Sequence, residues 1–249
     1  MLFITIALHA QRFVNTTLDG AQAVYAITQD TSGVVWLGTD NGLYSYDGYH
    51  DYRHFASHTF SHIRINALGF EGCMLYLATG NGLLKFDTQK GIYASAPAMD
   101  SDGGKGSKKV ARELRVLDMK GRKDAFGNDV YAILHTQKGL LVGSLAGLRL
   151  NQRQILLTPG AQPLVNALAY DAKRHCYWIG TEGALYCADQ ALQNFSKIAA
   201  LDGNSVKCLD EDQDGNLYIG TDNGLYRMAM NNSLEHFVHD SRNEATIPN

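Results

Sequence analysis

The sequence of 249 residues predicts an all-β protein of the β-propeller class. The first observation is that the seven residues 38–44 return unchanged at residues 220–226. The second is that weaker copies begin at residues 78, 143 and 180, so three of the four intervals are close to 40 residues. The third is that each copy lies among short β-rich segments. Four short strands per roughly 40 residues, repeated in tandem, are typical of propeller blades.

Each repeat is predicted to contain four antiparallel strands. The first strand covers residues 24–27, 65–68, 130–133, 165–168 and 206–209, and the second covers residues 35–37, 75–77, 140–142, 177–179 and 217–219. A tight turn joins them, because Asp30-x-x-Gly33 and Asp212-x-x-Gly215 combine a self-capping aspartate with a glycine that accepts positive φ. A third strand follows each Gly-Leu pair, and a less regular fourth strand follows it, for example at residues 52–55 and 195–198.

The residues around each Gly-Thr pair are predicted to pack the blades together. A single blade cannot bury both of its faces, so neighbouring blades must cover them. We expect the aromatic residue before Gly-Thr to pack between adjacent blades and the glycine before leucine to allow the second hairpin to turn. The predicted blade-packing residues are Trp36, Gly38, Thr39, Gly42, Tyr76, Trp178, Gly180, Thr181, Tyr218, Gly220, Thr221 and Gly224.

Composition excludes several other classes of protein. Hydrophobic residues make up 45% and charged residues 19%, which is enough for a packed core. The net charge of −3 disfavours a nucleic-acid-binding domain, which is usually basic. Four cysteines in 249 residues are too few for a disulfide scaffold. Residues 1–10 are apolar and end in alanine, so we expect the remnant of an export signal, with a first structural strand as the alternative.

The long interval of 65 residues contains a basic insertion at about residues 101–128. Residues 105–123 carry eight lysines and arginines against one glutamate and one aspartate. We expect a solvated loop that extends from one rim of the propeller. Contact with a partner or an anionic ligand is the functional alternative.

The repeats resemble a known family. The pattern V-x-x-I-x-x-D-x-x-G-x-x-W-x-G-T-x-x-G-L spans residues 24–43 and resembles the two-component regulator propeller repeat. Residues 206–225 fit it with Tyr218 in place of tryptophan, and the fourth repeat has Ala184 where glycine belongs. The second and third repeats depart further, at Ala78 and Ser144. The resemblance covers residues 22–249, which we take as one propeller region.

This resemblance implies a periplasmic sensor region of a hybrid two-component system. The five repeats would form part of a seven-bladed propeller, and the tail at residues 239–249 resembles the lead-in to a sixth inner strand. The implied partners are an oligosaccharide or other small ligand, a second copy in a homodimer, and the rest of the sensor in cis, including a histidine kinase and a membrane anchor. No nucleic acid, cofactor or enzymatic activity is expected for this segment. The alternatives are a protein-interaction or dimerisation scaffold and a carbohydrate-active propeller enzyme.

Ligand contacts are expected at a rim, near the ends of the inner strands. Asparagine and arginine suit sugar hydroxyls or a carboxylate because they offer donors and acceptors on a rigid base. Asparagine also commonly satisfies backbone groups at turns, which is the alternative role here. The candidate ligand-binding residues are Arg64, Asn66, Asn128, Asn166 and Asn204.

No catalytic or metal motif is predicted. The segment Asp210-x-Asp212-x-Asp214-Gly215 begins like a calcium loop, but Thr221 occupies the position of the bidentate glutamate. A hairpin that turns about residues 181–182 would pair Cys176 with Cys187. We therefore expect a cross-strand disulfide or, alternatively, two buried thiols.

Overall fold

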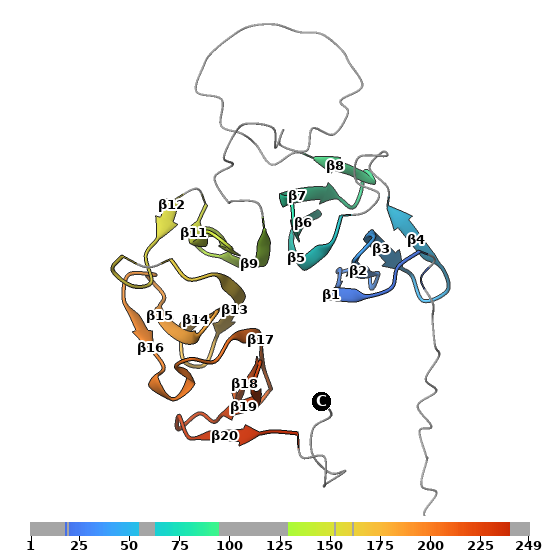
Figure 1. Cartoon of the computed structure of the whole chain (residues 1–249). Helices are drawn as coiled ribbons and strands as arrows, with labels where there is room; N and C mark the ends of the chain where they lie inside the picture. The colour runs from blue at the N-terminus through green and yellow to red at the C-terminus, as the bar shows by residue number, and fades with distance from the viewer. Residues whose placement is uncertain are drawn as a thin grey trace, which may run out of the picture.

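The computed structural model describes residue 18 and residues 20–54, 63–94, 129–151, 153–160 and 162–239. Within these residues the protein has twenty strands and one short 3₁₀ turn, Ala199–Leu201. The strands form five four-stranded antiparallel sheets that lie side by side in an arc around a central space (Figure 1). The predicted β-propeller architecture is confirmed.

Each sheet is one blade, and its strands follow one another from the centre of the arc outward. Blade 1 contains β1 (Val24–Gln29), β2 (Val35–Thr39), β3 (Gly42–Tyr46) and β4 (Asp51–His54). Blade 2 contains β5 (Ile65–Glu71), β6 (Met74–Thr79), β7 (Gly82–Asp87) and β8 (Ile92–Ala94). Blade 3 contains β9 (Val130–Thr136), β10 (Gly139–Ser144), β11 (Gly147–Leu150) and β12 (Arg153–Ile155). Blade 4 contains β13 (Val165–Asp171), β14 (Cys176–Thr181), β15 (Ala184–Asp189) and β16 (Phe195–Lys197). Blade 5 contains β17 (Val206–Glu211), β18 (Leu217–Thr221), β19 (Gly224–Met228) and β20 (Leu234–Phe237).

The aspartate after the inner strand builds the first hairpin of blade 1. The Asp30 carboxylate accepts hydrogen bonds from the backbone N–H of Ser32 (2.9 Å) and of Val34 (3.0 Å). Its second oxygen accepts a hydrogen bond from Nε1 of Trp36 at 2.9 Å. The aspartate therefore closes the turn and orients the indole that packs against blade 2.

A threonine or serine hydroxyl closes the second hairpin of every blade. In blade 1, the hydroxyl of Thr39 donates to the carbonyl of Gly42 at 2.8 Å and accepts from the backbone N–H of Asn41 at 2.9 Å. Gly42 has a φ of 100°, a conformation that favours glycine. In blade 4, Gly183 takes the positive φ one residue earlier, which explains why Ala184 is tolerated. The equivalent hydroxyl donors to the strand that follows are Thr79, Ser144, Thr181 and Thr221.

Consecutive blades meet in seams that follow one packing rule. The first residue of each inner strand, which we call the knob, lies on a small residue of the second strand of the preceding blade, which we call the socket. A Cβ added to Gly38 would lie 2.7 Å from Cγ2 of Ile65. One added to Gly180 would lie 2.5 Å from Cγ1 of Val206. At Gly38 and Gly180, a methyl group would therefore overlap the β-branched knob that lies on the socket.

The other two seams are variants of the same arrangement. Gly143 of blade 3 is the socket for Val165, whose Cγ1 would lie 2.6 Å from an added Cβ. Ala78 of blade 2 occupies the socket position opposite Val130, and both are fully buried. Hydrophobic clusters extend these seams toward the outer strands. The core of the protein is therefore divided among four seams.

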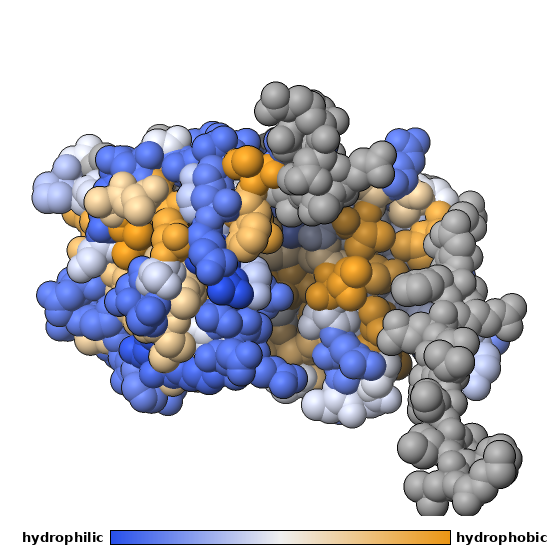
Figure 2. Space-filling view, turned by 90° about the horizontal axis from the view of Figure 1, so that it is seen from below, coloured by the Kyte–Doolittle hydropathy of each residue, from blue (hydrophilic) through white to orange (hydrophobic). Residues whose placement is uncertain are grey.

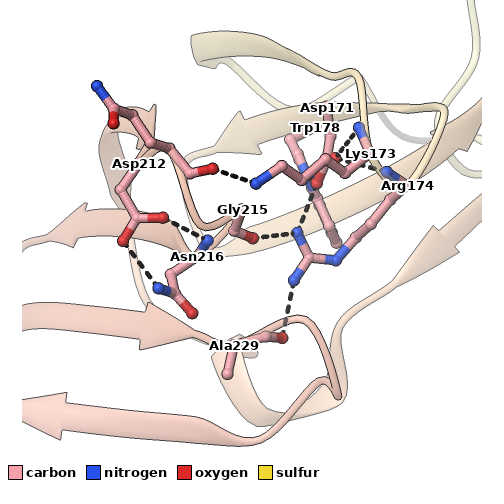
Figure 3. Close-up of polar contacts among 9 residues, drawn as sticks. Asp171, Lys173, Arg174, Trp178, Asp212, Gly215, Asn216 and Ala229 are labelled. Carbon is pink, nitrogen blue, oxygen red and sulfur yellow. Dashed lines mark hydrogen bonds and ion pairs between the residues drawn. The ribbon is translucent and has the colours of Figure 1, made fainter.

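A buried ion pair joins blades 4 and 5 (Figure 3). Arg174 Nη1 donates to Asp171 Oδ2 at 2.6 Å and to the carbonyl of Gly215 at 2.8 Å. Nη2 donates to the carbonyl of Ala229 at 2.7 Å, and Trp178 Nε1 donates to Asp171 Oδ2 at 3.1 Å. The guanidinium thus connects the first hairpin of blade 4 to two turns of blade 5.

The arc is open between blade 5 and blade 1 (Figure 1). Figure 2 shows hydrophobic surface in the hollow on this side of the molecule. Among the large hydrophobic residues exposed on β1 are Val24, Tyr25 and Ile27, and Ile27 is 69% exposed. The predicted signal at residues 1–10 and the basic insertion at about residues 101–128 lie outside the described residues.

Candidate functional site

The inner strands place one side chain per blade at the rim of the central space. Each inner strand begins with a register shift, so its second residue has no direct partner in the next strand. A bulge of this kind redirects a side chain out of the ladder. The five redirected residues are Tyr25, Asn66, Tyr131, Asn166 and Lys207.

The first two blades bring an aromatic ring, a guanidinium and an amide together. The guanidinium carbon of Arg64 lies 4.6 Å from the centroid of the Tyr25 ring. Arg64 Nε donates to Asn66 Oδ1 at 2.7 Å, while Asn66 Nδ2 donates to the carbonyl of Val130 in blade 3 at 2.8 Å. Arg64 is exposed and Tyr25 is 46% exposed, so both present surface to a ligand.

Tyr131 adds a second aromatic side chain, surrounded by charged groups. Burial raises the pKa of Tyr131, and the carboxylates of Asp129 and Glu182 raise it further, while Arg64 lowers it. Arg64 thus acts electrostatically on Tyr131 as well as stacking on Tyr25. The rim combines flat aromatic surface with a guanidinium and carboxylates, which is suited to a polyhydroxylated or ionic small ligand.

Not all of the predicted ligand-binding residues are available to a ligand. Asn166 Nδ2 donates to the carbonyl of Val206 at 3.0 Å, as Asn66 does to Val130, so these two amides bridge seams. Asn204 is half-buried in the lead-in to blade 5, and its N–H donates to the carbonyl of Leu201 at 3.2 Å. Asn128 lies outside the described residues. Arg64 is thus the member of the predicted set that best retains an exposed, charged head group.

Sequence reasoning missed the aromatic and acidic members of the rim. Tyr25 and Tyr131 occupy the same repeat position as Asn66 and Asn166, immediately after the knob. Aligning the five repeats on their knobs identifies them. Asp129 lies in a lead-in where the repeats share no residue type, so no sequence signal marks it. Glu182 occupies the hairpin position that holds Asp40 and Asp222 in the first and fifth repeats, so aligning the repeats marks an acidic position there.

The predicted blade-packing residues occupy seam and turn positions. Trp36, Tyr76 and Trp178 are buried, whereas Tyr218 of blade 5 is half-buried. Gly38 and Gly180 are sockets in covered seams. Gly42 and Gly224 have φ values of 100° in their hairpins. The hydroxyls of Thr39, Thr181 and Thr221 close the same turns. The socket of blade 5 is Gly220.

The register expected for Cys176 is wrong. The hairpin turns at residues 182–183, so Cys176 pairs with Asp189, and Cys187 pairs with Trp178. Both cysteines are free thiols on one face of the blade, as diagonal rather than direct neighbours. Burial raises the pKa of the Cys176 thiol, and the neighbouring Cys187 raises it further. The disulfide stays a prediction.

The segment Asp210-x-Asp212-x-Asp214-Gly215, which begins like a calcium loop, belongs to the hairpin between β17 and β18. The Asp212 carboxylate accepts from the backbone N–H and from Nδ2 of Asn216, both at 2.8 Å, and so caps its hairpin. No cluster of three or more metal-ligating side chains occurs among the described residues. These residues also contain no helix long and apolar enough to cross a membrane.

A shallow groove of about 570 Å³ lies between the outer strands of blades 3 and 4. Its lining has no charged side chain, and it includes Leu156, Leu157, Thr158, Pro159, Asn194 and Phe195. We favour the inner rim over this groove because the rim combines a guanidinium, carboxylates and aromatic rings from several blades.

The fold and the rim together define a repeat propeller with a polar and aromatic central site. Residues 19–41 and 200–223 match the family model described as two component regulator propeller. These segments fall in the first and fifth repeats, where the sequence pattern is most complete. The resemblance found in the sequence is confirmed over these two segments. No curated protein sequence matches the chain.

Solved structures of similar fold include the extracellular domains of two proteins from B. thetaiotaomicron that are described as hybrid two component systems. The extracellular domain of BT4673, assigned to the hybrid two component systems, is 26% identical with a TM-score of 0.58. The match covers 96% of this chain and 36% of that chain. The equivalent domain of BT3049 is 17% identical with a TM-score of 0.55, over 91% of this chain and 36% of that one. This chain therefore spans about a third of the length of these relatives.

A propeller enzyme also shares the fold. The GH74 enzyme of Niastella koreensis is 15% identical with a TM-score of 0.63, and the match covers 94% of this chain and 39% of that chain. At this identity the likeness concerns the fold alone. Similar structures therefore include both extracellular domains of two component systems and an enzyme.

Proposed function

We propose that this propeller is the ligand-sensing region of an exported two-component sensor and that it binds an oligosaccharide at the inner rim. The observation that carries the ligand site is the stacked pair of Arg64 and Tyr25 beside Tyr131. Aromatic faces pack against sugar rings, and charged planar groups hydrogen-bond to hydroxyls or carboxylates. The likeness to the extracellular domain of BT4673 supports the sensing role and a periplasmic location.

Signalling requires a second state of the protein. A ligand shifts a conformational equilibrium only by its difference in affinity for the two states. The rim residues come from different blades, so a ligand that contacts Tyr25 and Tyr131 would fix blade 1 relative to blade 3. We propose that this relative position is the quantity passed to a histidine kinase in cis.

Calorimetric titration of the full chain with neutral and acidic oligosaccharides tests the ligand assignment. We expect binding of at least one oligosaccharide and a loss of about tenfold or more in affinity, about 1.4 kcal/mol, for Tyr25→Ala. Tyr49→Ala is the matched control, because Tyr49 is 87% exposed in the outer turn of blade 1. Equal losses in both variants would contradict a rim site.

Two further measurements separate the rival functions. Retained self-association with no oligosaccharide binding would favour a scaffold. Turnover of a polysaccharide at high protein concentration would favour an enzyme, which needs an acid and base pair near the scissile bond.

A further inference from the structure

We propose that the seam between blades 2 and 3 is an acid-sensitive joint, which opens when the imidazole of His135 takes up a proton. His135 lies on β9 of blade 3 and faces blade 2. The packing of this seam and the groups around His135 carry the inference, which concerns the scaffold rather than the ligand.

Among the described residues, the seam between blades 2 and 3 has the smallest apolar core of the four covered seams. Its cluster of buried hydrophobic residues consists of Ala78, Val130 and Val142. The clusters of the other three seams contain buried leucines together with buried aromatic rings. The stabilisation from apolar burial is roughly proportional to the buried area, so this seam receives least of it. A buried charge therefore has the greatest effect on the closed state of this seam.

Polar and aromatic side chains lie in this seam beside the small cluster. The His135 ring lies edge-on to the buried Tyr76 ring, with the centroids 4.8 Å apart. Lys85 Nζ lies 4.4 Å from the centroid of the same tyrosine ring. The Tyr76 hydroxyl donates to Glu71 Oε2 at 2.6 Å. A Cβ added to Gly69 would lie 3.8 Å from Cδ2 of His135, so the imidazole packs against the inner strand of blade 2.

The imidazole fits this place in its neutral form. Its Nε2 atom is buried and has no hydrogen-bond partner among the described residues. Protonation makes both ring nitrogens donors, and a buried donor without an acceptor is costly. Burial lowers the pKa of His135, the carboxylate of Glu71 raises it and the charge of Lys85 lowers it, so the pKa lies below its ordinary value.

The other charged groups that face His135 do not offset an imidazolium. Among the described residues, the carboxylates on the facing strands already have partners. Glu71 accepts from a tyrosine hydroxyl, and Asp87 pairs with Lys90 at 2.9 Å. Arg149 lies on the same face of blade 3 as His135 and adds positive charge.

The lowered pKa fixes the direction of the pH response. His135 binds its proton more weakly in the closed seam than in an open seam, where water surrounds the ring. Acid therefore favours the open seam, and the closed state loses stability as the pH falls through the ordinary histidine pKa of 6.5.

The repeats supply a variant that removes the titration and keeps the ring. Phe70 occupies the same repeat position in blade 2 and packs against the cluster that contains Trp36. A phenyl ring therefore serves at this position in the seam between blades 1 and 2. His135→Phe should give a seam that is closed at neutral and at acid pH.

Opening this seam would also disturb the proposed ligand site. Asn66 of blade 2 donates across the seam to the carbonyl of Val130, and Tyr131 follows Val130 in blade 3. The side chains of Arg64 and Tyr131 would then move apart, and ligand affinity would fall with pH. This consequence rests on the proposed function, whereas the opening of the seam does not.

Hydrogen exchange of the full chain at about pH 7.5 and about pH 5.5 tests the joint. The rates are corrected for the pH dependence of chemical exchange. We expect the strands on the two sides of the seam, residues 74–79 and 130–136, to lose protection by about tenfold or more at the lower pH. Blade 4, at residues 165–171 and 176–181, is the internal reference and should change less.

Two variants show whether His135 is responsible. His135→Phe should keep the protection of both strands at the lower pH. His50→Phe is the matched control, because His50 is exposed in the outer turn of blade 1, and this variant should respond as the wild type does. Lys85→Met removes a positive charge that faces His135, so its loss of protection should be smaller than that of the wild type.

Three results would overturn the proposal. One is equal protection of residues 74–79 and 130–136 at the two pH values in the wild type. Another is a loss in blade 4 as large as the loss in these strands, because this would show general loosening. The third is a full loss in His135→Phe or, if that variant does not fold, a full loss in Lys85→Met. The measurement uses no ligand, so failure of oligosaccharide binding would leave its outcome unchanged.

Discussion

Blades 1 and 5 contain the same seven residues in different surroundings. Residues 38–44 and 220–226 have identical sequences and form the same second hairpin. In blade 1, Leu43 is fully buried under blade 2, whereas Leu225 in blade 5 remains half-buried. The shared segment therefore specifies a hairpin and a socket, and the next blade decides whether the socket becomes part of the core.

The largest expected effect comes from comparing Arg174, in the covered seam between blades 4 and 5, with Arg227, on the open face of blade 5. We expect Arg174→Met to lower the free energy of unfolding by about 3–5 kcal/mol, because it leaves the buried carboxylate of Asp171 without its partner. Arg227→Met removes an exposed pair with Glu235 on the open face of blade 5 and should cost at most about 1 kcal/mol. Urea unfolding of both variants checks this, and similar losses would break the contrast.

The charge of Asp171 gives the next effect and a pH dependence. Burial raises the pKa of Asp171, but hydrogen bonds and the charge of Arg174 lower it more, so it lies below its ordinary value. A carboxyl group with a depressed folded pKa adds stability above its unfolded pKa and loses it as the pH falls through the folded value. Asp171→Asn should therefore cost about 2–3 kcal/mol near pH 7.

The matching measurement is unfolding of the wild type and Asp171→Asn across the acid range. The difference between them should shrink below the ordinary aspartate pKa of 3.8. A difference that stays constant down to that range and below would show that the variant acts through shape rather than charge.

Adding one methyl group to a socket tests the seams directly. Gly180→Ala places a Cβ 2.5 Å from Cγ1 of Val206, so we expect a loss of about 2 kcal/mol from overpacking. The three atoms nearest to a Cβ added at Gly220 all belong to Cys208, whose exposed thiol can move, so the cost of Gly220→Ala should be below about 1 kcal/mol. Thermal unfolding of the two variants compares a covered socket with an open one. The comparison fails if Gly220→Ala is the more damaging.

The smallest expected effect concerns the hydroxyls that close the second hairpins. Thr39→Val leaves the carbonyl of Gly42 without its hydroxyl donor at a fully buried position, and should cost about 1–2 kcal/mol. Thr221→Val makes the same change where water can reach the turn, so its cost should be about half as large. Denaturant midpoints of both variants, compared at equal m-values, check that Thr39→Val lowers the stability more than Thr221→Val does.

The fold was predictable because the five repeats carry the same pattern of strand and turn residues. The near-40-residue period and the turn residues Asp30 and Gly42 identified four-stranded blades without any knowledge of contacts. The register of the second hairpin in blade 4 was missed although the repeats carry it. Thr181 pairs with Ala184 as Thr39 pairs with Gly42, so the turn falls at residues 182–183 and Cys176 pairs with Asp189.

The rim was harder to predict than the blades. Asn66 and Asn166 were chosen for their hydrogen-bonding groups, but the sequence does not show that the carbonyls of Val130 and Val206 engage them. In the sequence, Tyr25 has the context of an ordinary aromatic residue in a strand. Only the β-bulge seen in the structure places its side chain at the rim. Side-chain availability depends on the neighbouring blade, and sequence patterns within one repeat do not contain that information.

The one-way order of sockets and knobs has a consequence for synthesis on the ribosome. Each socket is translated before the knob that fills it, so a newly made blade waits with an exposed face until the next inner strand emerges. The open face of each blade is therefore buried only after the next blade has been synthesised, and this burial proceeds from the N-terminal end of the arc. Within the described arc Val24 is the exception, because no described blade supplies a socket for it and it remains 45% exposed.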